Sequence, residues 1–244
     1  MPNIAVIQEI VTGLVYLAVG IRLVQLSRST NESPELLLGL SFVLWGSNYL
    51  LYNIPYRFLE AAAVVPFSFV ARLALDLGVF LFTLFVWKVF RSDARWGGWL
   101  VASVAALLLA GIGGSVWVKD WEGMLPIRNP WFWPAWLANL IAYAWMIAEG
   151  FPQYRRSRRR RSLGLCSAIL CDRFGLWVTA GVIWFLLHWI LLYLFIGYDI
   201  TGEFHDPTCA LVGFMQIVPA AAMWLTFCPP AFYRAWVERR YALD

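Results

Sequence analysis

Two oppositely charged residues, Arg72 and Asp76, lie four positions apart inside a long apolar stretch of the sequence. Residues four apart share one face of an α-helix, so these two side chains can form an ion pair. A charge in the interior of a bilayer costs about 3 kcal/mol or more unless it is paired or hydrated, and such residues usually serve function. The pair predicts either a ligand or ion site or a neutralised contact that fixes helix packing.

Further polar residues lie in the neighbouring apolar stretches, mainly in the same half. Amide side chains in membrane helices often hydrogen-bond to a neighbouring helix. Ligand pockets between helices combine apolar walls with a few converging polar groups. Two hypotheses follow: separate interhelical contacts, or one cavity open to the outside. The predicted binding residues are Arg72, Asp76, Asn48, Asn139 and His188; the wider polar set adds Gln8, Glu9, Asn53 and Gln216, and the predicted walls are Trp45, Trp136, Trp184 and Trp189.

A run of arginines, six in seven residues, occupies positions 155–161. It is typical of a cytoplasmic loop that contacts anionic lipids. A cytoplasmic protein partner is an alternative, whereas nucleic-acid binding is not expected from so short a loop. Glu149 precedes the run and is expected to pair with these arginines or with Arg173. The predicted contact residues are Arg155, Arg156, Arg158, Arg159, Arg160 and Arg161.

Several cofactors are not expected. Retinal needs a buried lysine for its Schiff base, and the two lysines, Lys88 and Lys119, stand at the ends of apolar stretches. A membrane haem usually needs paired axial ligands, and the chain has two histidines, His188 and His205. His205 lies beside acidic residues, which leaves an exposed metal site as a weak alternative. We expect His188 to form a hydrogen bond in the core.

No catalytic motif supports an enzyme. The sequence has no nucleophile elbow of the Gly-x-Ser-x-Gly type, no phosphate-binding glycine loop and no His-Glu-x-x-His zinc motif. Catalysis is therefore not predicted, and no cofactor is assigned.

The composition indicates that hydrocarbon surrounds most of the chain. Of 244 residues, 61% are hydrophobic and 14% are charged, whereas soluble domains carry about 25% charged residues. A spanning helix needs roughly 20 mainly apolar residues. The sequence thus predicts an all-α integral membrane protein whose residues 1–230 form a seven-transmembrane-helix bundle. The predicted spans are Ile4–Leu26, Pro34–Pro55, Ala61–Phe90, Gly97–Val118, Pro130–Phe151, Phe174–Tyr198 and Thr208–Phe227.

The distribution of charge predicts the orientation of this bundle. Most of the 19 basic residues fall in one set of connections and in the C-terminal tail, whereas acidic residues predominate in the opposite set. Short cytoplasmic loops retain Lys and Arg, so the N-terminus is expected outside and the C-terminus in the cytoplasm. Pro66 marks either a kink in the third span or its true start.

The tail, residues 231–244, alternates aromatic residues with arginines. Phe232 and Trp236 are interleaved with Arg234, Arg239 and Arg240, a pattern typical of an amphipathic helix on the inner leaflet. The preceding Pro229-Pro230 pair is expected to turn the chain into the membrane plane.

Four segments resemble an uncharacterised family of bacterial seven-transmembrane proteins. They are Pro34–Gly39, Trp87–Arg91, Asp172–Phe174 and Pro230–Arg234. The resemblance implies the seven-helix architecture and a location in the bacterial cytoplasmic membrane. It implies no activity.

Two other layouts are similar in part. Pro230-x-x-Tyr233 before an amphipathic helix resembles the end of the last span in G-protein-coupled receptors, whose bundle is also shared by rhodopsins; Pro229 stands where the receptor motif has Asn. Pro152-Gln153 resembles one half of the PQ-loop carriers, but the first span has no matching pair. Similarity of layout does not establish function.

Three functional hypotheses follow. The leading one is a sensor or receptor-like protein that binds a small molecule or lipid in an outer-half pocket and signals through the arginine run and the C-terminal helix. The second is a small-solute or ion transporter, with Asp76 as a protonatable coupling group. The third is a structural subunit of a larger membrane complex.

Overall fold

The computed structural model describes residues 4–118, 127–201 and 206–242, and all regular structure within these ranges is helical. The long apolar stretches form long helices because few Gly or Pro residues interrupt their interiors. The helices are α1 (Ile4–Thr30), α2 (Ser33–Phe58), α3 (Ala61–Phe90), α4 (Arg95–Trp117), α5 (Phe132–Ser162), α6 (Ala168–Thr201), α7 (Asp206–Phe227) and α8 (Ala231–Ala242).

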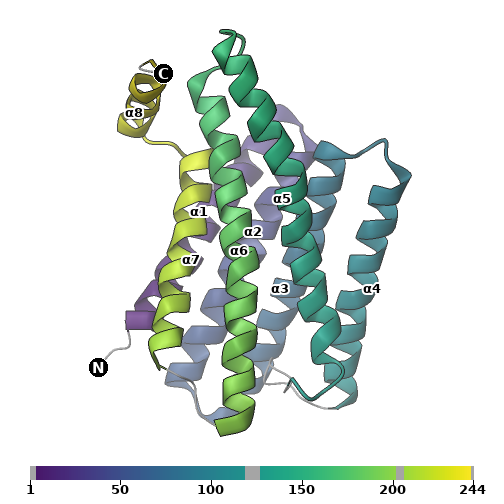
Figure 1. The fold of residues 1–244 in the computed structure, drawn as a ribbon. Coiled ribbons are helices and arrows are strands. Elements are labelled where there is room, and N and C mark those ends of the chain that lie inside the picture. Colours follow the sequence, from purple (N-terminus) through teal and green to yellow (C-terminus); the bar gives the residue numbers. More distant parts are fainter. Residues whose placement is uncertain (1–3, 119–126, 202–205, 243–244) are drawn as a thin grey trace.

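Helices α1–α7 run side by side as an up-and-down bundle, and α8 lies at one end of it (Figure 1). Helix α1 packs against α2 and α7, α2 against α3, and α6 against α5 and α7. Helix α4 stands at the edge, where it packs against α3 and α5. The chain bends by 89° between α7 and α8, at the predicted Pro229-Pro230 turn.

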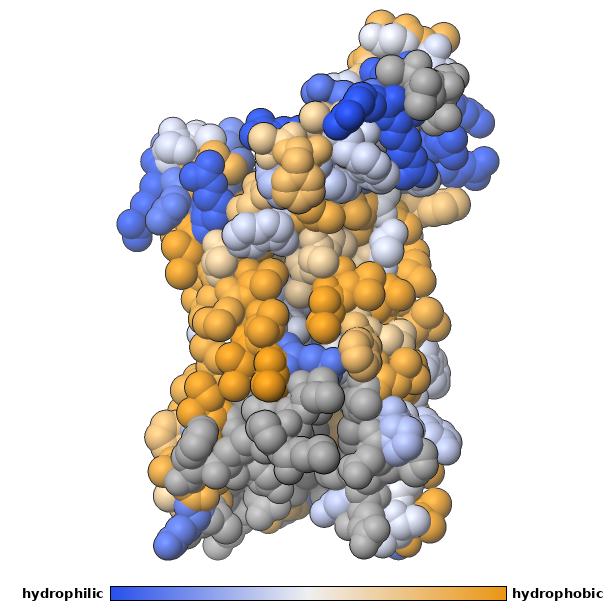
Figure 2. Space-filling view, turned by 90° about the vertical axis from the view of Figure 1, so that its left-hand side faces the viewer, coloured by the Kyte–Doolittle hydropathy of each residue, from blue (hydrophilic) through white to orange (hydrophobic). Residues whose placement is uncertain are grey.

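The length and composition of the helices suggest a multi-pass membrane protein. Within the described residues, α1, α3, α4 and α6 are long and apolar enough to cross a membrane, and a fifth span is added if α7 and α8 count as one. Helices α2 and α5 are as long but contain more polar residues. On the face shown in Figure 2, an apolar band crosses the middle and hydrophilic side chains gather at the end that bears α8.

Two helices extend beyond their predicted limits at the end of the bundle near α8. Helix α5 continues past Phe151 through the whole arginine run, because Arg favours the helix and no Gly interrupts it. It ends where Gly164 adopts a left-handed backbone with φ of 71°, the usual conformation just after a helix. Helix α6 begins at Ala168, six residues before its predicted start. Pro66 does not mark the start of α3, which begins at Ala61.

Glycines bring the backbones of α1 and α2 into direct contact. A Cβ atom added to Gly20 would lie 2.7 Å from the carbonyl oxygen of Gly39, and one added to Gly46 would lie 2.6 Å from the carbonyl oxygen of Gly13. Small residues permit this close approach between membrane helices. The contact fixes the position of the α1–α2 pair beside the aromatic core.

An ion pair ties α3 to α5 at the end of the bundle near α8. Arg91 Nε donates to Glu149 Oε1 at 2.7 Å, and Trp145 Nε1 donates to the same oxygen at 3.3 Å. The hydrogen bond and the charge of Glu149 raise the pKa of the Arg91 guanidinium, which therefore stays cationic. The expectation that Glu149 pairs with the arginine run or Arg173 was wrong, because its partner comes from α3, which is distant in sequence.

Candidate binding cavity

A cavity of about 330 Å³ lies between six helices, α1, α2, α3, α5, α6 and α7. It occupies the half of the bundle away from α8, since its residues come from the start of α3, α5 and α7 and the end of α2 and α6. Its volume lies within the usual range for small-molecule pockets, roughly 300–1,000 Å³. The structure places all five predicted binding residues in its lining: Asn48, Arg72, Asp76, Asn139 and His188.

Arg72 and Asp76 form the predicted ion pair on one face of α3. Arg72 Nε lies 2.9 Å from Asp76 Oδ2, and the two side chains are 17% and 2% exposed. The second carboxylate oxygen, Asp76 Oδ1, has no hydrogen-bond partner within the described part of the chain. A buried acceptor without a partner costs about 1–3 kcal/mol. The pair is thus neutral in total charge but incompletely satisfied.

Three other polar side chains hydrogen-bond to backbone carbonyl groups. Asn48 Nδ2 donates to the carbonyl oxygen of Ala71 at 2.9 Å, which links α2 to α3. Asn139 Nδ2 donates to that of Ala135 at 2.9 Å, one turn earlier in α5. His188 Nδ1 lies 3.0 Å from the carbonyl oxygen of Trp184 in α6. Because a carbonyl group only accepts, Nδ1 carries the proton in the neutral imidazole ring and Nε2 is left as an acceptor.

Aromatic rings form most of the remaining wall. Trp45 lies centrally, with ring centroids 5.3 Å from Trp184 and 6.3 Å from Tyr143. Trp184 Nε1 donates to the Tyr16 hydroxyl at 3.2 Å, and the Tyr143 ring lies 4.9 Å from the His188 ring. The Trp45 indole N–H has no partner within the described residues. These contacts hold the rings in fixed positions around the cavity.

The additional polar residues of the prediction, Gln8, Glu9, Asn53 and Gln216, do not all line the cavity. Glu9 and Gln216 line the cavity. Gln8 is buried and lies against Gly213 of α7 instead, and its Oε1 atom has no hydrogen-bond partner within the described residues. The side chain of Asn53 lies outside the described part of the structure.

One predicted wall residue is misplaced. Trp189 does not line the cavity; it is 48% exposed, and its ring stands edge-on to that of Trp136 with centroids 5.2 Å apart. Trp189 follows His188 directly, and one residue turns a helix by about 100°. At this position the rotation carries the Trp189 side chain out of the lining, whereas the adjacent residues Asn48 and Tyr49 both remain in it.

Sequence analysis missed several lining residues. Tyr49 and Tyr52 contribute to the cavity from α2, and Phe132 and Tyr143 from α5. The signal was present in α2, because Trp45, Tyr49 and Tyr52 recur at spacings of four and three and so share one helix face. In α5 the apolar residues give no such indication.

The arginine run lies far from the cavity. Arg155, Arg156, Arg158, Arg159 and Arg160 are exposed and Arg161 is half-buried, all on the last turns of α5. Helix α8 lies at the same end, where the Tyr233 hydroxyl donates to Asp172 Oδ2 of α6. The two predicted sites thus occupy opposite ends of the bundle.

Within the described residues, no group of three His, Cys, Asp or Glu side chains could hold a metal ion. The weak alternative at His205 lies outside these residues. Comparison with protein-family models, curated proteins and solved structures gives no match to the chain.

Proposed function

We propose that α1–α7 each cross a bacterial cytoplasmic membrane, with the N-terminus outside and α8 on the cytoplasmic side. The support is the direction of one polar residue in the apolar part of each of the two less apolar helices: Asn48 of α2 and Asn139 of α5 line the cavity. Such residues are shielded from lipid, so they do not prevent a helix from spanning. Most Lys and Arg residues lie at the α8 end, which favours the cytoplasm for that end.

Within this topology the protein is a receptor-like sensor that binds a small molecule or lipid in the cavity. One observation carries this proposal: five polar residues from four helices converge on an aromatic-walled cavity, where Asp76 Oδ1 has no hydrogen-bond partner within the described residues. The Arg72–Asp76 ion pair lies within one helix and lines this cavity. That placement supports a ligand that contacts the pair.

Packed rings connect the cavity with the turn before α8. Phe82 lies 6.2 Å from Trp184 at the cavity and 5.9 Å from Trp177, which in turn lies 6.4 Å from Phe227. Phe227 is the last residue of α7. A ligand that displaces Trp184 would therefore disturb a continuous ring contact that reaches the α7–α8 turn. This supports signalling to an anionic lipid surface or a cytoplasmic partner at the α8 end.

The binding proposal can be tested on the purified full-length protein in dodecyl maltoside micelles. A fragment library of acids, amines and neutral aromatic compounds is screened by the shift in thermal unfolding temperature. We expect some fragments to stabilise the protein, and we expect Leu191→Trp, which fills the cavity, to abolish their effect. Leu109→Trp is the matched control, because Leu109 is 68% exposed on the outer face of α4. Binding that survives Leu191→Trp, or no binding at all, contradicts the proposal.

A transporter is the second candidate, supported by the location of Asp76 beside a cavity within the bilayer. Reconstituted liposomes distinguish the two functions. Uptake of a stabilising fragment that depends on Asp76 indicates a carrier, whereas binding without uptake indicates a receptor. Co-purification with a stoichiometric membrane partner would instead favour the structural subunit.

A further inference from the structure

We infer that the cavity selects a molecule with a protonated primary or secondary amine on an apolar skeleton. This inference rests on the proposed binding function and specifies the ligand class. It follows from three properties of the lining: its free hydrogen-bonding atoms, its formal charge and its aromatic walls.

The buried Asp76 carboxylate supplies the strongest acceptor in the lining, because its Oδ1 atom has no hydrogen-bond partner within the described part of the chain. Asn48, Asn139 and His188 each direct one N–H group to a backbone carbonyl oxygen. Each amide keeps its Oδ1 acceptor and one further N–H group, and the imidazole keeps Nε2 as an acceptor. An ammonium group supplies two or three donors and satisfies several such acceptors at once.

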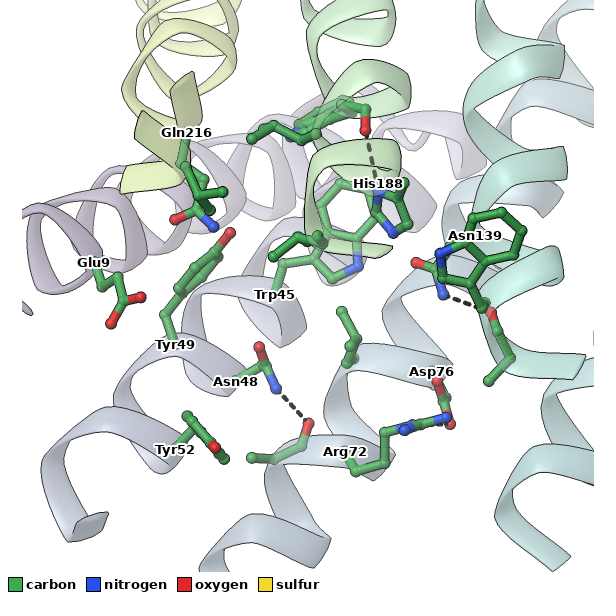
Figure 3. Close-up of a pocket in the computed structure, with 18 of the residues that line it drawn as sticks. Glu9, Trp45, Asn48, Tyr49, Tyr52, Arg72, Asp76, Asn139, His188 and Gln216 are labelled. Atoms are coloured by element: carbon green, nitrogen blue, oxygen red, sulfur yellow. Dashed lines mark hydrogen bonds and ion pairs between the residues drawn. The ribbon is translucent and has the colours of Figure 1, made fainter. Parts of the chain in front are cut away.

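Figure 3 shows that three of these acceptor residues lie toward the same side of the cavity. Asp76 comes from α3, Asn139 from α5 and His188 from α6, and the ring of Tyr143 stands against that of His188. Glu9 and Tyr49 lie toward the other side of the close-up. We place the amine among Asp76, Asn139 and His188, with the apolar skeleton along the aromatic rings.

The charged residues of the lining also favour a cation. The lining contains two carboxylates, Glu9 and Asp76, and one guanidinium, Arg72, whose Nε–H group donates to Asp76. With His188 neutral, the formal charge of these side chains sums to about −1. A ligand carboxylate at this place would be repelled by the Asp76 carboxylate. A ligand ammonium would be attracted by it and would donate to Asp76 Oδ1, which has no partner within the described residues.

The aromatic walls suit the same ligand class. An ammonium group over the face of Trp or Tyr is attracted by the ring quadrupole, most strongly where water is excluded. The indole N–H group of Trp136, which has no partner within the described residues, suits a neutral oxygen, such as a hydroxyl or carbonyl group, on the same molecule. It carries no charge and so does not offset the preference for a cation.

The test uses three probes with one skeleton, 3-phenylpropylamine, 3-phenylpropan-1-ol and 3-phenylpropanoate, at pH 7. Binding to the full-length protein in dodecyl maltoside is measured by calorimetry and by tryptophan fluorescence, since Trp45, Trp136 and Trp184 line the cavity. We expect the amine to bind at least about tenfold more tightly than the alcohol, which is the difference that one charge-assisted hydrogen bond provides. We expect the carboxylate to bind weakest of the three.

Three variants locate the effect. Asp76→Asn should reduce amine affinity about tenfold while alcohol affinity stays the same, because it removes the charge and keeps the side-chain size. Asn139→Leu removes a second acceptor, the amide oxygen, and replaces it with an apolar side chain of the same branched shape. It leaves the Arg72–Asp76 ion pair in place, so it tests the inference if Asp76→Asn fails to fold. Thr83→Val is the control: Thr83 is buried in the same helix, bonds only to the backbone oxygen of Val79 and does not line the cavity.

Each outcome decides a separate point. Equal binding of amine and alcohol, or tightest binding of the carboxylate, overturns the inference about the amine and leaves the proposed binding function intact. Loss of amine selectivity in Thr83→Val also overturns it. If none of the three probes binds while uncharged or acidic library fragments still bind in a manner that Leu191→Trp abolishes, the ligand class is wrong and the cavity is functional. If no fragment binds, both proposals fail.

Discussion

Helix α3 carries two ion pairs that differ in almost every respect. Arg72 and Asp76 belong to the same helix and lie beside the cavity, and Asp76 Oδ1 has no partner among the residues that the structure describes. Arg91 at the other end reaches Glu149 of α5, and Trp145 donates a second hydrogen bond to the same oxygen. Arg91 also lies over the ring of Trp96 in α4, 5.7 Å from its centroid.

The difference separates a structural contact from a candidate functional one. The Arg91–Glu149 pair joins α3, α4 and α5, and all of its geometry is explained by helix assembly. The Arg72–Asp76 ion pair lies within α3, and it is the more buried of the two. Burying a charge pair often contributes no net stability compared with apolar residues of the same size. We therefore expect the protein to fold without the Arg72–Asp76 pair only when both residues are replaced together by apolar residues.

The largest expected effect is that of Asp76→Ala. This variant removes the carboxylate that neutralises the half-buried Arg72 guanidinium, which should lower the free energy of unfolding by about 3 kcal/mol. Unfolding in sodium dodecyl sulfate, followed by circular dichroism, measures the change. The double variant Arg72→Met with Asp76→Leu should recover most of the stability and still lose amine binding. Wild-type stability and binding in Asp76→Ala would remove any role for the pair.

The next largest effect concerns the structural pair. Glu149→Gln should lower the unfolding temperature by a few degrees, because it weakens the link between α3 and α5, and it should leave binding in the cavity unchanged. Exchanging the charges in the double variant Arg91→Glu with Glu149→Arg should recover part of the loss. Altered cavity binding in Glu149→Gln would show that the two pairs are coupled and that our division between them is wrong.

A smaller effect is expected where α8 docks on the bundle. Tyr233→Phe removes the hydroxyl that donates to Asp172, and one hydrogen bond contributes about 1 kcal/mol. Hydrogen exchange of the backbone amides of α8 should become faster, while the unfolding temperature of the bundle and amine binding remain unchanged. Unaltered exchange would show that Val237, which is fully buried, holds α8 without the hydrogen bond.

The smallest effect is expected from Thr83→Val. The Thr83 hydroxyl donates to a carbonyl oxygen of its own helix at 2.7 Å, and valine matches threonine in shape. Stability should change by about 0.5 kcal/mol or less, the net contribution of a weak local hydrogen bond. A loss as large as that of Asp76→Ala would mean that any buried polar change in α3 is harmful, and the special position of Asp76 would be lost.

Much of the fold could be predicted because membrane helices satisfy their own backbone hydrogen bonds. The start of α3 at Ala61 and of α8 at Ala231 agrees with the sequence analysis, since Glu60 and Pro229-Pro230 interrupt the apolar pattern. The length of α5 could not be predicted from hydropathy, because the helix continues beyond the apolar residues into the arginine run. Hydropathy indicates which solvent a side chain prefers, whereas the length of a helix depends on how far its backbone hydrogen bonds continue.

The sequence predicted the depth of the candidate site within the bundle, but it did not predict how each helix is rotated about its own axis. Asn48, Arg72, Asp76, Asn139 and His188 were chosen for their shared depth, and the structure places them around one cavity. Trp189 was chosen on the same ground and faces outward. The partner of Glu149 also could not be predicted, because Arg91 is separated from it by 58 positions.

The sequence by itself determined the helices, their apolar surroundings and the Arg72–Asp76 pair, because each depends on residues within a few turns of one another. Only the tertiary structure decided that six helices enclose a cavity, that Asn48 donates across to α3, and that Asp76 Oδ1 has no partner within the described residues. These properties depend on how each helix is rotated about its axis when the bundle packs. That rotation is set by contacts such as the glycine contact of α1 with α2, between residues distant in the chain.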